Sequence, residues 1–307
     1  MAHHPRIYST LAALALVWGV AFVGIKWALR DLSPTELLVA RFLLTSAILS
    51  VLMVFYPKAR PRFPRGSRIR IVILAVCGVP LYHLPLNWGE QHTTAQIASL
   101  IIATAPILVA VGGVKVLGER LTLTRIVGLG CSFLGVVVLT LGTRSEPGVE
   151  VTIPGVLAVA IATITWAVYT IVAKPLMDRM SAMTVTSTTL LLGSLSLIPF
   201  LTPATFRSIA DASAGTLAWV AVLGAGSSVL GYLLFVWLVR HLDASQSGMI
   251  LYLVPVVGVA AGALILDEPL GWPVAAAAAL VLLGIRLTER PAPPAPAPPA
   301  PSSEARA

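Results

Sequence analysis

Hydrophobic residues along this chain fall into ten runs, which short polar or proline-containing segments separate. Most runs are about 20 residues long, the length that a helix needs to cross about 30 Å of hydrocarbon. The runs lack the alternating polarity that is typical of membrane-barrel strands. The pattern therefore predicts an all-α integral membrane protein with ten transmembrane helices.

The predicted helices are separated by turn-forming residues such as Ser33-Pro34, Thr93-Thr94, Pro203 and Pro269. They span Ile7–Leu29, Pro34–Tyr56, Ile69–Gln91, Ala95–Leu117, Leu123–Leu141, Ile153–Met177, Ala182–Leu201, Leu217–Val239, Ser245–Leu266 and Trp272–Leu287.

One apolar stretch of the chain occurs twice. Ala95–Leu121, with Pro106 in its middle and Glu119 near its end, recurs 149 positions later (244 − 95) with Pro255 and Glu268 in the matching places. A period this long is typical of a duplicated half-protein and not of an array of short repeats.

The duplication also includes the first helix, because Trp18 matches Trp166 at an offset of 148 (166 − 18). Each half has five predicted helices, an odd number, so the second half must enter the bilayer from the opposite side. The sequence thus predicts two inverted five-helix repeats, 1–143 and 144–290. A Pro/Ala-rich tail, 291–307, is predicted to be disordered and cytoplasmic.

Composition agrees with a membrane class, since 57% of the residues are hydrophobic and 11% are charged, with a mean hydropathy of +0.90. The two cysteines, Cys77 and Cys131, lie in apolar segments without metal-ligand spacing. We interpret them as packing residues and expect neither a metal nor a cofactor.

The formal net charge of +8 raises the question of nucleic-acid binding. Six positive residues lie in one loop, between Lys58 and Arg70, whereas the loops on the opposite side contain only Arg30, Arg144 and Arg207. This asymmetry predicts a multi-pass inner-membrane protein with both termini in the cytoplasm. The basic loop is then a topology signal that can also contact anionic lipid, and no nucleic-acid partner is expected.

Three motifs of the chain resemble those of the EamA family of the drug/metabolite transporter superfamily, over Ile7 to about Leu287. They are Trp18-Gly19, Pro106 followed by Gly118-Glu119-Arg120-Leu121, and the echo of the second motif in Pro255 with Asp267-Glu268-Pro269-Leu270.

This resemblance implies a ten-helix carrier whose central cavity is lined mainly by the first, third, fourth, sixth, eighth and ninth helices. It also implies export of amino acids or related small metabolites. The aromatic-amino-acid exporters of the YddG type are the members to compare first, because aromatic residues lie where a cavity is expected.

Trp18 and Trp166 lie near the middle of their helices, although tryptophan in membrane proteins usually lies at the interface. Two indoles at the midplane could flank an apolar or aromatic substrate, although packing in the core is the alternative. Tyr232 in the eighth helix and Tyr252 in the ninth are further candidates for the cavity wall.

The third predicted helix carries a polar stripe in which His83, Asn87 and Glu90 follow helical spacing. Lipid would penalise this face, so it is expected to point inward, with Tyr82 beside it. His83 could bind substrate or carry a proton, or it could simply join two helices by a hydrogen bond.

Charged residues within the helices are interpreted as gating or structural groups. An Arg41–Glu90 ion pair is geometrically possible, and Lys26 or Arg41 could instead attract a substrate carboxylate. Glu119 and Glu268 lie at the ends of matching helices on opposite sides of the membrane, where anchoring or a gate-closing ion pair is expected.

Two prolines, Pro106 and Pro255, interrupt the matching fourth and ninth helices. Each removes a backbone donor, and the result is either a hinge or a passive kink. Gly258 and Gly262 favour close helix packing within a monomer over a stable dimer, so we expect a monomer or a weak dimer.

Two other function classes fit the sequence less well. An enzyme is disfavoured because the chain lacks HExxH, GxSxG and nucleotide-binding glycine motifs. Multidrug cation/proton antiporters of the small-multidrug type depend on a glutamate in their first helix. The first predicted helix of this chain contains none, so this class is disfavoured. A metabolite uptake carrier stays open, since no residue pattern distinguishes export from uptake.

Overall fold

The computed structural model describes residues 4–57, 60–105, 107–109, 112, 123–143, 151–177, 179–241 and 244–288, and in these ranges all regular structure is helical. The helices of the first half are α1 (His4–Ala28), α2 (Pro34–Phe55), α3 (Arg68–Gly78), α4 (Pro80–Gln91), α5 (Ala95–Ile102) and α7 (Leu123–Thr143). Those of the second half are α8 (Ile153–Met177), α9 (Ala182–Leu195), the 3₁₀-helix η2 (Ile198–Phe200), α10 (Pro203–Asp211), α11 (Ala214–Ala221), the π-helix η3 (Val222–Leu230), α12 (Gly231–His241), α13 (Ala244–Ile265) and α14 (Trp272–Thr288).

The predicted all-α membrane class is confirmed. In the described part of the chain, five helical segments are long and apolar enough to cross a membrane: Arg6–Ala28, Pro34–Phe55, Arg68–Gln91, Ile153–Ala173 and Ala214–Leu238. Shorter apolar helices occupy the remaining predicted positions. The count of ten spans stays a prediction.

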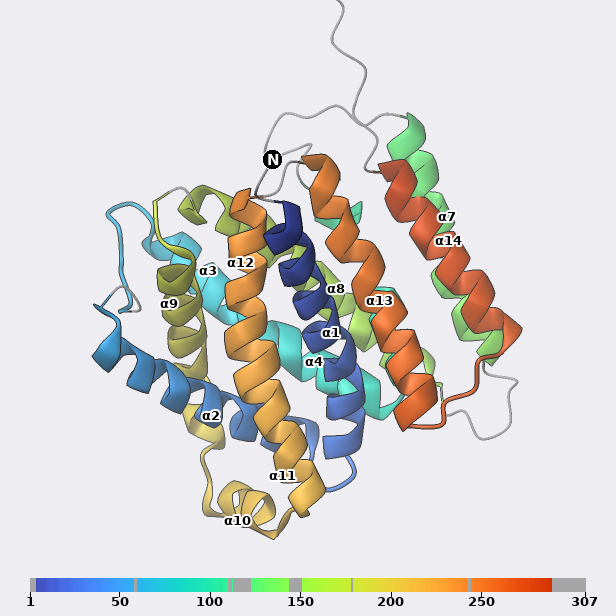
Figure 1. Ribbon diagram of the computed structural model, residues 1–307. Coiled ribbons are helices and arrows are strands. Elements are labelled where there is room, and N and C mark those ends of the chain that lie inside the picture. The colour runs from blue at the N-terminus through green and yellow to red at the C-terminus, as the bar shows by residue number, and fades with distance from the viewer. Residues whose placement is uncertain are drawn as a thin grey trace, which may run out of the picture.

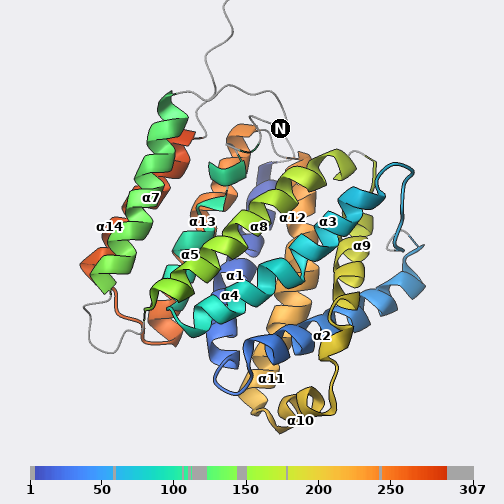
Figure 2. The same ribbon diagram turned by 180° about the vertical axis from the view of Figure 1, so that it is seen from behind.

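The helices form a bundle around α1, which lies between α12 and α13 (Figure 1). From behind, α4 and α8 cross the bundle together, and α3 precedes α4 almost end to end (Figure 2). The pair α7 and α14 lies side by side at one edge in both views. This arrangement brings helices from both halves of the chain to the centre.

Positions that match in the sequence repeat face each other where α7 packs against α14. Ser132 donates a hydrogen bond from Oγ to the carbonyl of Val281, at 3.4 Å. Gly135 approaches the backbone of α14 and Gly284 that of α7, each too closely for an unshifted Cβ atom. Both Ser132–Val281 and Gly135–Gly284 are separated by 149 positions. The contact is therefore symmetric about an axis between the two helices. Such symmetry is expected when two copies of a duplicated helix pack against each other.

The start of α2 is fixed by a capping box. Ser33 Oγ accepts from the Glu36 amide at 3.3 Å, and the Glu36 carboxylate accepts from the Ser33 amide at 2.8 Å. Ser181, which matches Ser33 at the offset of 148, caps α9 by accepting from the Thr184 amide. Serine at these two turns thus determines where the second helix of each half begins.

The third predicted helix, Ile69–Gln91, is in fact two helices. Val79 adopts φ −120° and ψ −82° between α3 and α4. Proline disfavours helical backbone at the residue before it, and Pro80 supplies the first residue of α4. The predicted span is therefore interrupted at Val79, although Arg68–Gln91 as a whole is long and apolar enough to cross a membrane.

The eighth predicted helix, Leu217–Val239, is irregular at the matching place. It starts earlier, at Ala214, and its middle is the π-helix η3. Val79 plus the repeat offset of 149 is Ser228, which lies in η3. Matching helices of the two halves therefore lose regular α geometry at the same position, by a break in one and by a wider turn in the other.

Two further boundaries differ from the prediction. The seventh helix, predicted to end at Leu201, ends at Leu195, and the amphipathic helix α10 follows η2. The fourth predicted helix has a turn at Ala103 and Thr104, just before Pro106. Pro106 itself lies outside the described residues.

Candidate functional site

A small cavity of about 60 Å³ lies where α1, α2, α4, α8 and η3 meet, near the start of α12 and beside α5 and α13. Its apolar wall includes Phe22, Ile25, Leu86, Ile102 and Val254. Six residues that the sequence predicted for the substrate site or the gate also line it: Trp18, Arg41, Tyr82, His83, Trp166 and Tyr232.

Aromatic rings from both halves make up one side of this cavity. The ring centroids of Trp18 and Trp166 are 5.5 Å apart with the planes at 87°, an edge-to-face contact. Trp166 also lies 5.2 Å from Tyr82 and 5.6 Å from Tyr232. The structure thus brings together the two tryptophans that the sequence repeat paired.

Two aromatic side chains bind backbone carbonyls at the irregular helix positions. Tyr232 donates from its hydroxyl to the Gly78 carbonyl at 3.1 Å, at the end of α3. Trp18 donates from Nε1 to the Ser227 carbonyl at 3.2 Å, inside η3. Gly78 and Ser227 are 149 positions apart, and each donor belongs to the half opposite its acceptor. Helix ends and π-turns leave backbone carbonyls without a donor from their own helix. The carbonyls of Gly78 and Ser227 can therefore accept from side chains of another helix.

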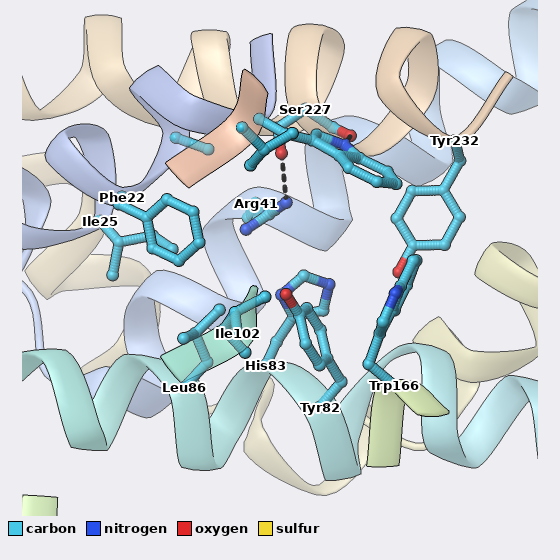
Figure 3. A pocket seen from close by; sticks show the side chains of 13 residues that line it. Phe22, Ile25, Arg41, Tyr82, His83, Leu86, Ile102, Trp166, Ser227 and Tyr232 are labelled. Atoms are coloured by element: carbon cyan, nitrogen blue, oxygen red, sulfur yellow. Dashed lines mark hydrogen bonds between the residues drawn. The ribbon is translucent and has the colours of Figure 1, made fainter. Parts of the chain in front are cut away.

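Arg41 is buried, with 2% of its surface exposed, and lies at the cavity wall. Its Nε donates to Ser228 Oγ at 2.8 Å and its Nη2 donates to Ser227 Oγ at 3.0 Å. Figure 3 shows Arg41 between Ser227 on one side and Tyr82 and His83 on the other. The serine hydroxyls of η3 therefore hold the guanidinium in place.

The possible Arg41–Glu90 ion pair does not form. Both Glu90 carboxylate oxygens are buried without a hydrogen-bond partner among the described residues, while Arg41 binds the two serines. The reason is the π-helix, which presents two adjacent hydroxyls to Arg41 from the other half of the chain.

The predicted polar stripe of the third helix is buried as expected. His83, Asn87 and Glu90 are 2%, 1% and 0% exposed. Of these three, only His83 lines the cavity. Asn87 donates from Nδ2 to the Pro34 carbonyl at 3.1 Å and so joins α4 to the start of α2.

His83 packs between aromatic neighbours and makes no hydrogen bond with the described residues. Its ring centroid is 4.6 Å from Tyr82 and 5.0 Å from Phe42, and both ring nitrogens are buried without a partner. The alternative of a histidine that joins two helices by a hydrogen bond is therefore not what this structure shows. Tyr232 lies 149 positions after His83, so matching positions of the two halves both line the cavity.

Glu268 binds the first amides of α5. Its Oε1 accepts from the Ala95 amide at 2.7 Å and its Oε2 accepts from the Gln96 amide at 3.0 Å. Burial raises the pKa of the Glu268 carboxyl, whereas the two amide donors act in the opposite direction. Glu268 thus anchors the start of α5 and lies away from the cavity.

Lys26 lies at the same end of the bundle as Glu268. Its Nζ donates to the carbonyls of Thr93 at 2.6 Å and Glu90 at 2.8 Å, at the turn between α4 and α5. Lys26 and Glu268 both line a second pocket at this end, separate from the aromatic cavity.

The structure describes some of the remaining predicted residues and leaves others outside its described ranges. Glu119 and the side chain of Tyr252 lie outside the described residues, as does Pro106. Pro255 is buried inside α13. The glycines Gly258 and Gly262 both pack within the chain, against Ser99 and Gln96 of α5.

Sequence reasoning missed Ser227 and Ser228. They belong to a run of small residues, Gly224 to Ser228, in the eighth predicted helix. Small residues permit close backbone approach and a wider helical turn, so this run was the available signal.

The sequence profile of the EamA-like transporter family matches the chain twice, over residues 6–141 and 153–290. The chain belongs to this family. The protein is therefore an integral membrane transporter of the drug/metabolite transporter superfamily, with a small-molecule substrate and contacts to membrane lipid. The EamA-like family is one of transporters and not of enzymes.

Relatives of this EamA-like chain carry transporter names. An "uncharacterized transporter" of Archaeoglobus fulgidus is 34% identical over 286 residues, covering 91% of this chain and 97% of the relative. A "probable terminal-alkyne amino-acid exporter" of Streptantibioticus cattleyicolor is 30% identical, covering 80% and 81%. A "probable amino-acid metabolite efflux pump" of Escherichia coli is 26% identical, covering 89% and 91%.

The fold also matches a solved crystal structure, with a TM-score of 0.64 at 20% identity, covering 92% of this chain and 97% of the other. At this identity the likeness concerns the fold alone.

Proposed function

We propose that this protein moves amino acids, aromatic or other neutral ones, or related small metabolites across the inner membrane by alternating access. The observation that carries this proposal is the cavity, where the matching tryptophans of the two halves, Trp18 and Trp166, meet. Inverted-repeat carriers bind their substrates near the midplane at the repeat interface. Two halves that rock about this point would expose it to each side in turn.

Export is the proposed direction. Two relatives are named as an exporter and an efflux pump for amino acids or their metabolites, which supports this choice. The positive loops support cytoplasmic termini, and the two profile matches support repeats close to 1–143 and 144–290.

A cation/proton antiporter is the competing function, and the cavity argues against it. The described lining contains no aspartate or glutamate, whereas it contains the cation Arg41. A cationic substrate would face repulsion in a medium where charge is poorly screened.

Transport by purified protein in proteoliposomes tests the proposal. The vesicles are loaded with labelled phenylalanine, tryptophan or leucine, and efflux is followed. We expect Trp18→Leu, His83→Leu and Trp166→Leu each to reduce flux by about tenfold or more, which corresponds to losing at least about 1.4 kcal/mol of binding.

Trp272→Leu is the matched control. Trp272 begins α14 and is 72% exposed, far from the cavity lining, so flux should stay at the wild-type level. Unchanged flux in all three cavity variants would contradict the assignment of the site.

A further inference from the structure

The cavity contains a buried cation that lacks an acidic partner among the described residues. Arg41 is held by two neutral hydroxyls, Ser227 and Ser228. Buried charges in membrane proteins are normally paired or belong to a functional site, because an uncompensated charge in a low-dielectric interior is costly. Hydroxyl dipoles compensate a guanidinium only in part.

The guanidinium has donors beyond those that the serines use. Arginine carries five N–H groups in a planar fork that matches the two oxygens of a carboxylate. Within the described residues, the recorded bonds of Arg41 start at Nε and Nη2 and end on serine hydroxyls. A bidentate anion is a stronger partner for this fork than two neutral hydroxyls.

His83 supplies a second buried polar group at the same cavity. Neither ring nitrogen has a hydrogen-bond partner in the described part of the chain, and the side chain is 2% exposed. A neutral imidazole always has one N–H donor. Figure 3 places His83 and Tyr82 across the cavity from Ser227, with Arg41 between them.

The remainder of the lining is apolar or aromatic, and its described residues include no carboxylate that could bind an ammonium group. The cavity volume of about 60 Å³ exceeds the roughly 10–15 Å³ that a single water molecule needs. That space fits a carboxylate with the first atoms of its substituent, while the rings of Trp18 and Trp166 adjoin it.

We propose that Arg41, together with His83 and Ser227, binds the carboxylate of the transported molecule, and that the amino group is not required for recognition. The substrate class is then small monocarboxylates with an apolar or aromatic body, including deaminated acids as well as amino acids. This inference rests on the proposed function, because it takes the cavity to be the substrate site. The N–H groups of Arg41 that the serines do not use are available to the substrate carboxylate.

Binding to the purified full-length protein tests this with two probe series. One series is phenylalanine, 3-phenylpropanoate and phenethylamine, and the other is leucine, 4-methylpentanoate and 3-methylbutylamine. We expect the carboxylates of at least one series to raise the melting temperature with saturation, because a ligand that binds the folded state stabilises it. The amines are expected to produce no shift.

Variants of Arg41 and one matched control complete the experiment. Arg41→Gln should weaken carboxylate binding by about tenfold or more, and Arg41→Lys, which keeps the charge but loses the fork, by a smaller factor. Arg207→Gln removes an exposed positive charge in α10 and should bind as the wild type does. If Arg41→Gln fails to fold, the wild-type series and Arg41→Lys still decide the question.

Several results would overturn the proposal. They are binding of the amines, a requirement for both the amino and the carboxyl group, no shift with any carboxylate, or unchanged affinity in Arg41→Gln.

The proposed transport function would be contradicted by other results. Carboxylates that bind through Arg41 without any flux of amino acids would remove the transport assignment and leave the anion site. Amino-acid flux that is unaffected in Arg41→Gln would remove the anion site and leave the transport assignment.

Discussion

Two side-chain donors, Tyr232 and Trp18, satisfy backbone carbonyls at Gly78 and Ser227. Both acceptors lie at irregular helix positions in the apolar interior, where a carbonyl without a partner costs about 1–3 kcal/mol. Each side chain therefore has two functions at once. It shapes the cavity wall and it stabilises the backbone irregularity of the other half.

The Tyr232 hydroxyl can be tested by Tyr232→Phe, which keeps the ring in the cavity wall. Because the Gly78 carbonyl loses its donor, we expect the free energy of unfolding to fall by about 1–3 kcal/mol. Thermal unfolding in detergent measures this.

Tyr56→Phe, at an exposed tyrosine after α2, is the control for that variant and should change stability by less than about 0.5 kcal/mol. Equal effects of the two substitutions would show that the hydrogen bond to Gly78 contributes nothing.

Most of the polar and aromatic residues of the cavity could be predicted from the sequence, whereas its aliphatic wall could not. Trp18 and Trp166 emerged from the repeat, and His83 from a polar stripe that lipid would penalise. The partner of Arg41 could not be predicted, because it depends on the rotation of one helix against another far along the chain. Serine in an apolar helix gives little signal, so Ser227 and Ser228 became visible only in the structure.

The third and eighth predicted helices depart from regular α geometry in different ways. Pro80 explains the break before α4, and the sequence contained that signal. The matching segment η3 contains no proline. Its wider turn carries the groups that Trp18 and Arg41 contact, and the run of small residues from Gly224 to Ser228 was its only local signal in the sequence.

Asp31 connects the turn after α1 to the first turn of α11. Its Oδ2 accepts from the Ser213 amide at 2.9 Å and from the Thr216 hydroxyl at 2.7 Å. Hydrogen bonds from Ser213 and Thr216 hold the pKa of this carboxyl below its usual value. This contact joins the two halves at the end of the bundle opposite the amino terminus (Figure 1).

The lowered pKa of Asp31 predicts a pH-dependent contribution to stability. A carboxyl whose pKa is lower in the folded state stabilises the fold above its unfolded pKa of about 3.9, and the contribution disappears as the pH falls through the folded value. We expect wild type to melt at a higher temperature than Asp31→Asn at pH 7, and the difference to close below about pH 4.

Asp211→Asn, which removes an exposed carboxylate at the end of α10, is the control for the loss of one negative charge. A constant gap between wild type and Asp31→Asn would contradict the role of the Asp31 charge.

The distribution of positive charge along the chain predicts how the protein is oriented in the membrane. The basic loop that contains Arg65 should face the cytoplasm, and α10, which contains Asp211, should face the opposite side. The native cysteines Cys77 and Cys131 can be replaced by alanine to give a background without thiols.

In that background, Asp211→Cys should react with a membrane-impermeant thiol reagent on intact cells. Arg65→Cys, also at an exposed position, should react only after the cells are permeabilised. The opposite labelling pattern would reverse the orientation, and labelling of both cysteines on intact cells would contradict the number of spans between them.

The crossed contacts at Gly78 and Ser227 also determine whether one half could be stable without the other. The third and the eighth predicted helices each have an irregular position, and the donor that stabilises it comes from the other half. A half produced alone would keep the opened carbonyl without its donor and would need a second copy to supply one. Each half therefore depends on the other for the stability of its own interior.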